Sequence, residues 1–160
     1  MKEQVNGAKN ALALAEKIYE AEVTSFPNLS LPDINAKNVE LSSLEGKPFI
    51  LMFWTISEAG QKMFNNDLKE IYKKYRSSGL EIYQVSLDVD KTAWASAVKD
   101  QELPWISVCD GKGAASPAVI AYNIITVPTM FVFNAKGDIV ASGNLTNAGD
   151  IENAVKKAVK

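Results

Sequence analysis

The sequence contains no histidine and only one cysteine, Cys109. Without histidine, the Ser-His and Cys-His pairs that activate nucleophiles are excluded, and so is nearly every catalytic zinc site. A single cysteine also excludes an internal disulfide and any Cys-x-x-Cys motif. We therefore predict no bound metal and no cofactor.

Long apolar runs and clusters of positive charge are missing as well. No stretch approaches the roughly 18 consecutive apolar residues that suggest a transmembrane helix, and charged residues interrupt positions 1–21, where a signal peptide would need an apolar segment. The 17 lysines and arginines are scattered among 19 aspartates and glutamates, for a net charge of −2. The sequence therefore indicates no transmembrane segment, no signal peptide and no nucleic-acid surface.

The composition instead indicates one compact domain. The chain has 160 residues, of which 47% are hydrophobic and 22% charged, enough to bury a sizeable core but too few residues for two domains. An amphipathic pattern predicts a helix at 3–24. We assign this helix to an appended or linker segment, residues 1–25, and the globular domain to residues 26–160.

The most distinctive stretch is an uninterrupted apolar run from Phe49 to Trp54. Such a run is typical of a central strand whose two faces are both covered. After a sharp turn, a helix is predicted to begin with Ser57 as its N-cap, to carry Glu58 in its first turn and to end near Arg76. The junction between a strand and a helix N-terminus is where α/β proteins usually place their chemistry.

The rest of the chain alternates strand and helix patterns. Extended residues at 26–33 and 39–41 flank a turn and predict an N-terminal β-hairpin. Further strands are predicted at 80–87, 104–108, 129–133 and 138–142, and further helices at 91–100, 115–122 and 147–160. This order predicts an α/β fold with a sheet of about five or more strands.

Several short motifs occur in an order that is typical of one protein family. They comprise the residues at 46–54, 85–88, 93–94, 103–105, 122–124, 127–129 and 134–140. Together they make residues 26–160 resemble the membrane- or envelope-associated thiol-disulfide oxidoreductases of the TlpA/ResA type, which are close to the AhpC/TSA group. The resemblance implies a thioredoxin-like central mixed sheet flanked by helices, with an N-terminal β-hairpin and an appended N-terminal helix.

The resemblance also implies a site whose central residues have changed. Family members carry Cys-x-x-Cys after the central strand, and those two positions correspond to Glu58 and Gln61 here. A cis peptide bond between Val127 and Pro128 should face this turn. Disulfide exchange requires a thiolate, which neither a carboxylate nor an amide can supply. Glu58 is expected instead to be a helix-capping carboxylate that replaced a catalytic cysteine.

The predicted function follows from the missing thiols. We expect a redox-inactive thioredoxin-like domain that binds a protein or peptide partner in its groove, or that serves as a structural module of a larger protein with an upstream domain. The groove is expected to be formed by Trp54, Ser57, Ala59, Gly60, Val127 and Pro128. The resemblance implies a location in the periplasm or cell envelope.

A second hypothesis keeps the domain enzymatic, as a thiol-disulfide oxidoreductase or a peroxiredoxin-like enzyme that uses Cys109 or the thiols of a partner. Cys109 follows a predicted strand and lies outside the position of the family's nucleophile. The neighbouring Asp110 disfavours a thiolate, and a free cysteine usually behaves as a small hydrophobic residue. We therefore expect Cys109 to be a partly buried residue at a strand end.

Overall fold

A computed structural model describes residues 26–58 and 60–160. The helix predicted at 3–24, the predicted appended segment 1–25 and the predicted groove residue Ala59 lie outside the described residues. Within the described ranges, no helix has the length and apolar character that crossing a membrane requires.

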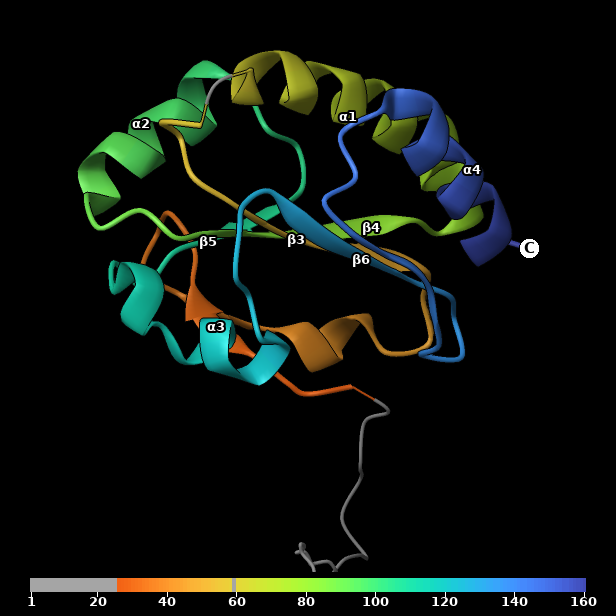
Figure 1. The fold of residues 1–160 in the computed structure, drawn as a ribbon, viewed down its shortest axis with the longest axis horizontal. Coiled ribbons are helices and arrows are strands. Elements are labelled where there is room, and N and C mark those ends of the chain that lie inside the picture. Colours follow the sequence, from red (N-terminus) through yellow and green to blue (C-terminus); the bar gives the residue numbers. More distant parts are fainter. Residues whose placement is uncertain (1–25, 59) are drawn as a thin grey trace, which may run out of the picture.

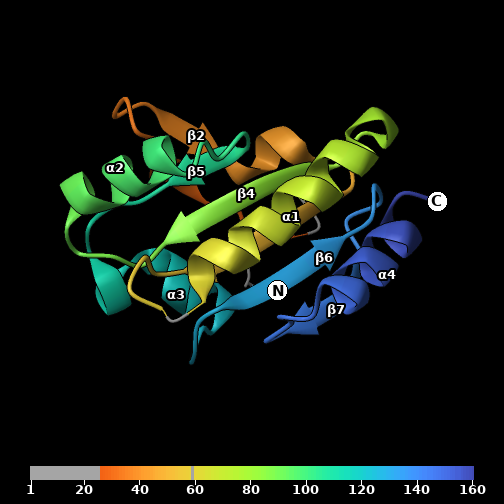
Figure 2. The ribbon, with the colours of Figure 1, turned by 90° about the horizontal axis from the view of Figure 1, so that it is seen from above.

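The domain is built on a mixed five-stranded sheet, as predicted (Figure 1 and Figure 2). In spatial order the strands are β5 Ile106–Val108, β4 Glu81–Ser86, β3 Phe49–Trp54, β6 Thr129–Phe133 and β7 Ile139–Gly143. The central strand, β3, pairs in parallel with β4 and antiparallel with β6. Every residue of β3 is buried because both faces of the sheet are covered, which explains the apolar run in the sequence.

Helices cover one face of the sheet, and shorter elements cover the other (Figure 1). On the first face lie α1 Gln61–Tyr75, α2 Lys91–Asp100 and α4 Ala148–Ala158. On the second face lie β1 Ser30–Pro32, β2 Asn38–Glu40, the 3₁₀ helix η1 Leu41–Leu44 and α3 Pro117–Tyr122. Strands β1 and β2 pair antiparallel, so the predicted N-terminal hairpin is confirmed.

The two faces of β3 contribute to two separate cores. Its even-numbered residues belong to the core beneath α1, α2 and α4, and its odd-numbered residues to the core beneath α3 and the hairpin. In the second core, the rings of Phe26, Phe49 and Phe133 pack against one another. The hydroxyl of Tyr83 donates a hydrogen bond to the carbonyl of Val39 (2.7 Å), which fastens the hairpin to the sheet.

The helix after β3 begins later than predicted. The connection contains two successive turns, in which the N–H of Glu58 donates to the carbonyl of Thr55 (3.3 Å) and that of Gln61 to the carbonyl of Glu58 (3.1 Å). The N-cap of α1 is Gly60, whose φ of 78° is a left-handed conformation that glycine adopts readily. The prediction that Ser57 caps the helix is therefore wrong. Glu58 lies before the first helical turn, so it is not a capping carboxylate.

The other predicted elements are present, with differences at their ends. Helix α1 ends at Tyr75, and a 3₁₀ turn, η2 Arg76–Ser78, follows it. The helix predicted at 115–122 divides into η3 Gly113–Ala115 and α3. The division arises because the side chain of Ser116 accepts the N–H of Ala118 and so caps α3 at this point.

Candidate functional site

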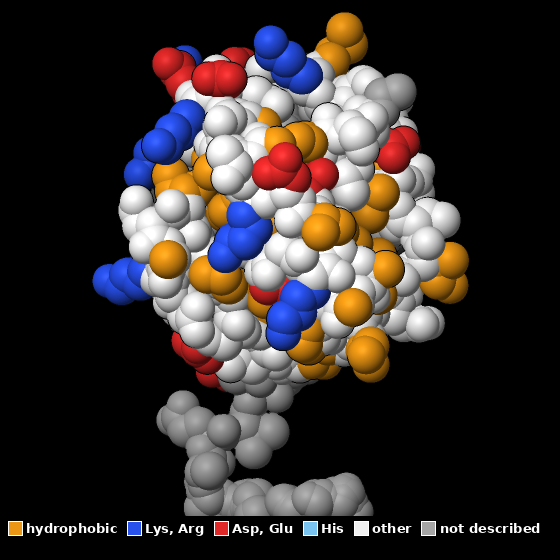
Figure 3. Space-filling view, turned by 90° about the vertical axis from the view of Figure 1, so that its left-hand side faces the viewer, with side chains coloured by type: hydrophobic (Ala, Val, Ile, Leu, Met, Phe, Trp, Pro, Cys, Tyr) orange, Lys and Arg blue, Asp and Glu red, His pale blue; other side chains and the backbone are white. Residues whose placement is uncertain are grey.

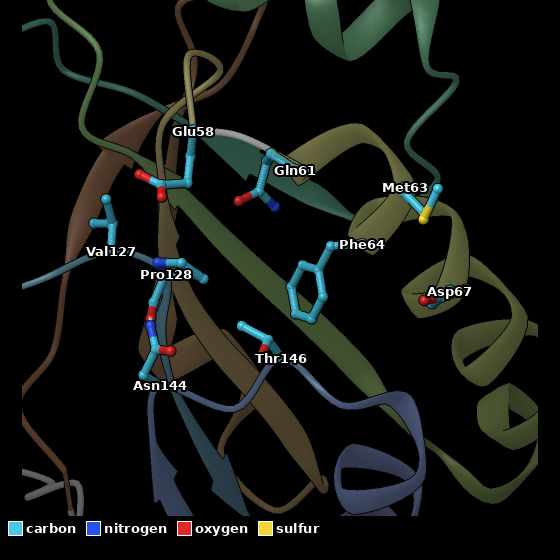
Figure 4. A pocket seen from close by; sticks show the side chains of 10 residues that line it. Glu58, Gln61, Met63, Phe64, Asp67, Val127, Pro128, Asn144 and Thr146 are labelled. Atoms are coloured by element: carbon cyan, nitrogen blue, oxygen red, sulfur yellow. The ribbon is translucent and has the colours of Figure 1, made fainter.

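The connection after β3 and the segment before β6 meet at one end of the sheet. Since these strands are antiparallel, with Phe53 opposite Thr129, the end of one lies beside the start of the other. The peptide bond between Val127 and Pro128 is cis, as predicted. Figure 4 shows this dipeptide beside the connection that carries Glu58. The cis bond that the resemblance implied therefore lies at the same end of the sheet as this connection.

A cavity of about 500 Å³ opens between these two segments (Figure 4). Its lining comes from the connection after β3, the first turns of α1, the cis dipeptide and the connection from β7 to α4. The lining residues are Glu58, Gly60, Gln61, Met63, Phe64, Asp67, Val127, Pro128, Asn144 and Thr146. The predicted groove residues Gly60, Val127 and Pro128 thus line the same cavity as Glu58 and Gln61.

Two other predicted groove residues lie elsewhere. Trp54 is completely buried in the core beneath α1, because the even-numbered residues of β3 all point to that face. It cannot contact a ligand, and its assignment to the groove is wrong. Ser57 is exposed but is not among the lining residues.

Asn144 and Thr146 line the cavity, although the sequence did not single them out. They lie between β7 and α4, and the side-chain amide of Asn144 donates a hydrogen bond to the carbonyl of Pro128. This bond joins the β7–α4 connection to the cis dipeptide. The only available signal was the position of two polar residues between the last strand and the last helix, which points to the site only once the fold is known.

The backbone of Val127 is available for hydrogen bonding at the edge of the cavity. Pairing between β6 and β3 begins at Thr129, and within 26–58 and 60–160 neither the N–H nor the carbonyl of Val127 has a hydrogen-bond partner. The side chain of Val127 is only half-buried. Backbone donors and acceptors of this kind bind extended peptides by strand addition.

Glu58 presents an exposed carboxylate to the cavity. No described side chain forms an ion pair or a hydrogen bond with it. A second exposed carboxylate, Asp67, lines the cavity from α1. Figure 4 shows the two carboxylates on opposite sides of the cavity. The lining therefore carries two negative charges that the described residues do not neutralise.

Gln61 is almost completely buried and belongs to a network of amides. Its side-chain N–H donates to Oδ1 of Asn65 (3.2 Å), which also accepts from Nε2 of Gln84 (3.0 Å). The Asn65 amide donates in turn to Oε1 of Gln101 (2.9 Å), and the indole N–H of Trp105 donates to Oε1 of Gln84 (2.9 Å). The network connects α1, β4, the end of α2 and the residue before β5.

The sequence did not predict this network. Two features of the sequence could have indicated it. Asn65 is a polar residue on the apolar side of α1, and Gln84 is a polar residue within the buried strand β4. Both side chains are completely buried. Buried amides of this kind require partners, since an unpaired one costs about 1–3 kcal/mol. The network therefore holds the first turn of α1 against the sheet.

The connection after β3 is also held from the end of β4. The backbone N–H of Ile56 donates to both carboxylate oxygens of Asp88 (3.3 and 3.1 Å). The hydroxyl of Ser86 donates to the same carboxylate (2.5 Å). These bonds fix the start of the connection without using Glu58 or Gln61.

Cys109 is completely buried at the end of β5, outside the cavity. Its Sγ donates to the backbone carbonyl of Asp88 (3.3 Å). Burial raises the pKa of the thiol, and the neighbouring carboxylates of Asp88 and Asp110 raise it further, against opposing hydrogen bonds from Ser86 and the backbone of Gly111. The predicted place at a strand end is confirmed, but the residue is completely rather than partly buried, and such a thiol is a poor nucleophile.

Metal-binding side chains do not gather at this site. Among the residues that the structure describes, no group of three or more histidine, cysteine, aspartate or glutamate side chains could hold a metal ion.

Comparisons with known proteins agree on one family. The model of the AhpC/TSA family matches residues 24–142. The thiol-disulfide oxidoreductase ResA of Bacillus subtilis is 32% identical over 148 residues, which cover 85% of this chain and 80% of that protein. ResA of Bacillus thuringiensis subsp. konkukian is 31% identical over 117 residues, which cover 71% of this chain and 64% of that protein.

Solved structures show the same relationship. A thiol-disulfide oxidoreductase from Bacteroides fragilis matches with a TM-score of 0.71 and 30% identity, over 81% of this chain and 98% of that one. The thioredoxin domain of a thiol-disulfide oxidoreductase from Bacteroides vulgatus matches with a TM-score of 0.76 and 25% identity, over 88% of this chain and 100% of that one. The predicted thioredoxin-like fold is therefore confirmed.

Proposed function

The chain belongs to the AhpC/TSA family, among thioredoxin-like proteins of the ResA type, and we propose that it binds an extended polypeptide segment without the dithiol chemistry of that family. The binding site is the cavity between Glu58 and the cis dipeptide. The observation that carries the proposal is the unpaired backbone N–H and carbonyl of Val127, for which no described residue supplies a partner. An extended segment that pairs with these groups would add a strand-like contact beside β6.

The chemistry of three side chains, Glu58, Gln61 and Cys109, supports the loss of dithiol activity. By the family resemblance Glu58 and Gln61 take the two cysteine positions, and neither side chain can form a disulfide. Cys109 is buried away from the cavity, and its raised pKa keeps the thiol protonated near neutral pH. The nucleophile that thiol-disulfide exchange requires is thus absent from the cavity.

Peptide binding is tested with a capped peptide of alternating valine and threonine, which favours an extended conformation. Adding it to the ¹⁵N-labelled protein should shift the amide resonance of Val127. Thr146→Trp should abolish the shift, because Thr146 is an exposed lining residue and an indole would fill the cavity. Thr146→Ser is the matched control and should bind like the wild type. Shifts that survive Thr146→Trp would place the peptide elsewhere and contradict the proposal.

The enzymatic alternative is tested by insulin reduction with dithiothreitol. The protein should not raise the rate above that of dithiothreitol alone, and a dithiol-containing ResA-type relative serves as the positive control. Turnover that disappears in Cys109→Ala would instead establish a reductase that uses this single thiol, and it would overturn the inactive assignment.

The biological setting is also part of the proposal. A location in the periplasm or cell envelope, with the domain as a structural or binding module beside an upstream domain, is supported by the likeness to ResA-type relatives. Fractionation of cells that express the full gene, with detection of the domain by antibody, tests it. Recovery in the cytosolic fraction would exclude the envelope location and leave the peptide-binding proposal unaffected.

A further inference from the structure

We infer that the polypeptide segment bound in this cavity carries a lysine or arginine side chain, which enters the cavity with the carboxylates of Glu58 and Asp67 on either side. The inference rests on the proposed function and adds to it the chemistry of the ligand.

The charge of the lining is of one sign. Glu58 and Asp67 are both exposed, and no lysine or arginine of the described residues lines the cavity. The ion pair that the described part of the chain does form, between Lys74 and Glu152 (2.6 Å), lies outside the cavity lining. A cationic group from a ligand would therefore meet two carboxylates that have no partner of their own. Electrostatic complementarity of this kind contributes more to the choice between differently charged ligands than to the affinity for any one of them.

The cavity also offers apolar surface where the stem of a long cationic side chain would lie. Phe64 lines it between the two carboxylates, Pro128 lines it on the side of Glu58, and Met63 lines it beside Asp67 (Figure 4). Lysine and arginine pack their methylene groups along such surfaces while the charged group remains at the polar edge. A small cation would use the carboxylates but not this surface, and two carboxylates alone do not provide the six to eight oxygens that calcium takes.

Exposed apolar side chains occur on or close to the segments that form the cavity. Met63, which lines it from α1, is 72% exposed, and Ile125, two residues before Val127, is 85% exposed. Figure 3, which views this end of the molecule, shows hydrophobic side chains distributed over its surface among charged ones. Apolar residues on either side of the cationic one would contact this surface, so the favoured segment alternates basic and apolar residues.

The test uses three analogues of the valine–threonine peptide, whose central residue is lysine, norleucine or glutamate. Norleucine is the reference, because it keeps the linear stem of lysine without the charge. The lysine peptide should bind about five-fold more tightly than the norleucine peptide, and the glutamate peptide should bind more weakly than both. Affinities are measured by titration calorimetry at low salt, where exposed charges are least screened.

Two protein variants locate the preference. Glu58→Gln combined with Asp67→Asn should reduce the lysine-over-norleucine ratio to about one. Glu45→Gln is the control, because Glu45 is exposed and precedes β3, at the opposite end of the strand from the cavity. It should keep the full ratio.

The outcomes separate this inference from the proposed function. If all three peptides bind equally and Thr146→Trp abolishes their binding, the groove is a peptide site and the inferred charge preference is wrong. If none of them binds, both are wrong. If the double variant still prefers the lysine peptide, or if Glu45→Gln loses the preference equally, residues outside the cavity recognise the lysine side chain and the inference is wrong.

Discussion

Glu58 and Gln61 lie three residues apart, beside the same cavity, and occupy opposite environments. The carboxylate of Glu58 is exposed at the cavity and has no described partner. The amide of Gln61 is 3% exposed and joins a buried network. Within one turn, therefore, the Gln61 side chain belongs to the interior and the Glu58 side chain to the surface. Stability and recognition can therefore be changed separately within one turn.

The largest expected effect comes from returning thiols to both positions. In a Cys109→Ala background, Glu58→Cys combined with Gln61→Cys should form a disulfide on mild oxidation and release two thiols on reduction. Alkylation followed by mass spectrometry measures the change. The single Glu58→Cys variant is the control and should remain alkylatable under the same oxidation. Two free thiols in the oxidised double variant would show that these positions do not correspond to the cysteine pair.

The next largest effect is expected at the centre of the amide network. Asn65→Ala removes the acceptor for two buried amides and the donor to a third, which should lower the free energy of unfolding by about 2–4 kcal/mol. Urea denaturation measures it. Asn66→Ala makes the same change one residue later, at an exposed position of α1, and should alter stability by less than about 0.5 kcal/mol. Equal losses in the two variants would mean that the network contributes nothing.

A smaller effect on stability is expected when Gln61 and Glu58 are each replaced by alanine. Gln61→Ala should cost about 1 kcal/mol, because Oδ1 of Asn65 loses one donor but keeps Gln84. Glu58→Ala should change the free energy of unfolding by less than about 0.5 kcal/mol. Chemical denaturation of the two variants in parallel measures the difference. A larger loss in Glu58→Ala would reverse the comparison.

The smallest effect concerns Cys109, whose burial resembles that of Gln61. Its pKa is raised in the folded protein, so the unfolded chain loses the thiol proton first as the pH rises through about 9. The stabilisation is complete below that pH and is lost above it. Between about pH 8 and about pH 10 the wild type should lose up to about 1 kcal/mol more than Cys109→Ala.

Thermal or urea unfolding across this pH range provides the measurement for both proteins. Tyr83 and Tyr122, whose pKa values are also raised by burial, are present in both, so the difference between the two curves isolates the thiol. Parallel curves would show that the thiol ionises equally in the folded and unfolded states.

The sequence predicted the parts of the fold that local patterns determine. The apolar run of β3, the hairpin at the N-terminus and the order of the later elements are all confirmed. The predicted start of α1 was wrong because capping preferences favoured Ser57. The chain instead makes two turns after β3 and enters the helix at Gly60, which has a left-handed conformation. The spacing of apolar residues in the sequence does not predict a backbone conformation of this kind.

The site was predicted through the resemblance more than through local patterns. The resemblance correctly placed Val127 and Pro128 opposite the turn. It also led to Trp54 being assigned to the groove, although a strand with two covered faces leaves no exposed side chain. Asn65, Gln84 and Gln101 meet only in three dimensions, so no spacing along the chain could have revealed their network.

The carboxylate of Asp88 has a consequence for engineering. It holds the N–H of Ile56 from the end of β4, so the entry to the turn is attached through groups that do not include the two side chains that follow it. Ser57 and Glu58 face solvent and take no part in that attachment. A designer could therefore graft other short sequences at these two positions, for a fluorophore, a metal-chelating residue or a recognition motif, on a backbone that the neighbouring strand already keeps in place.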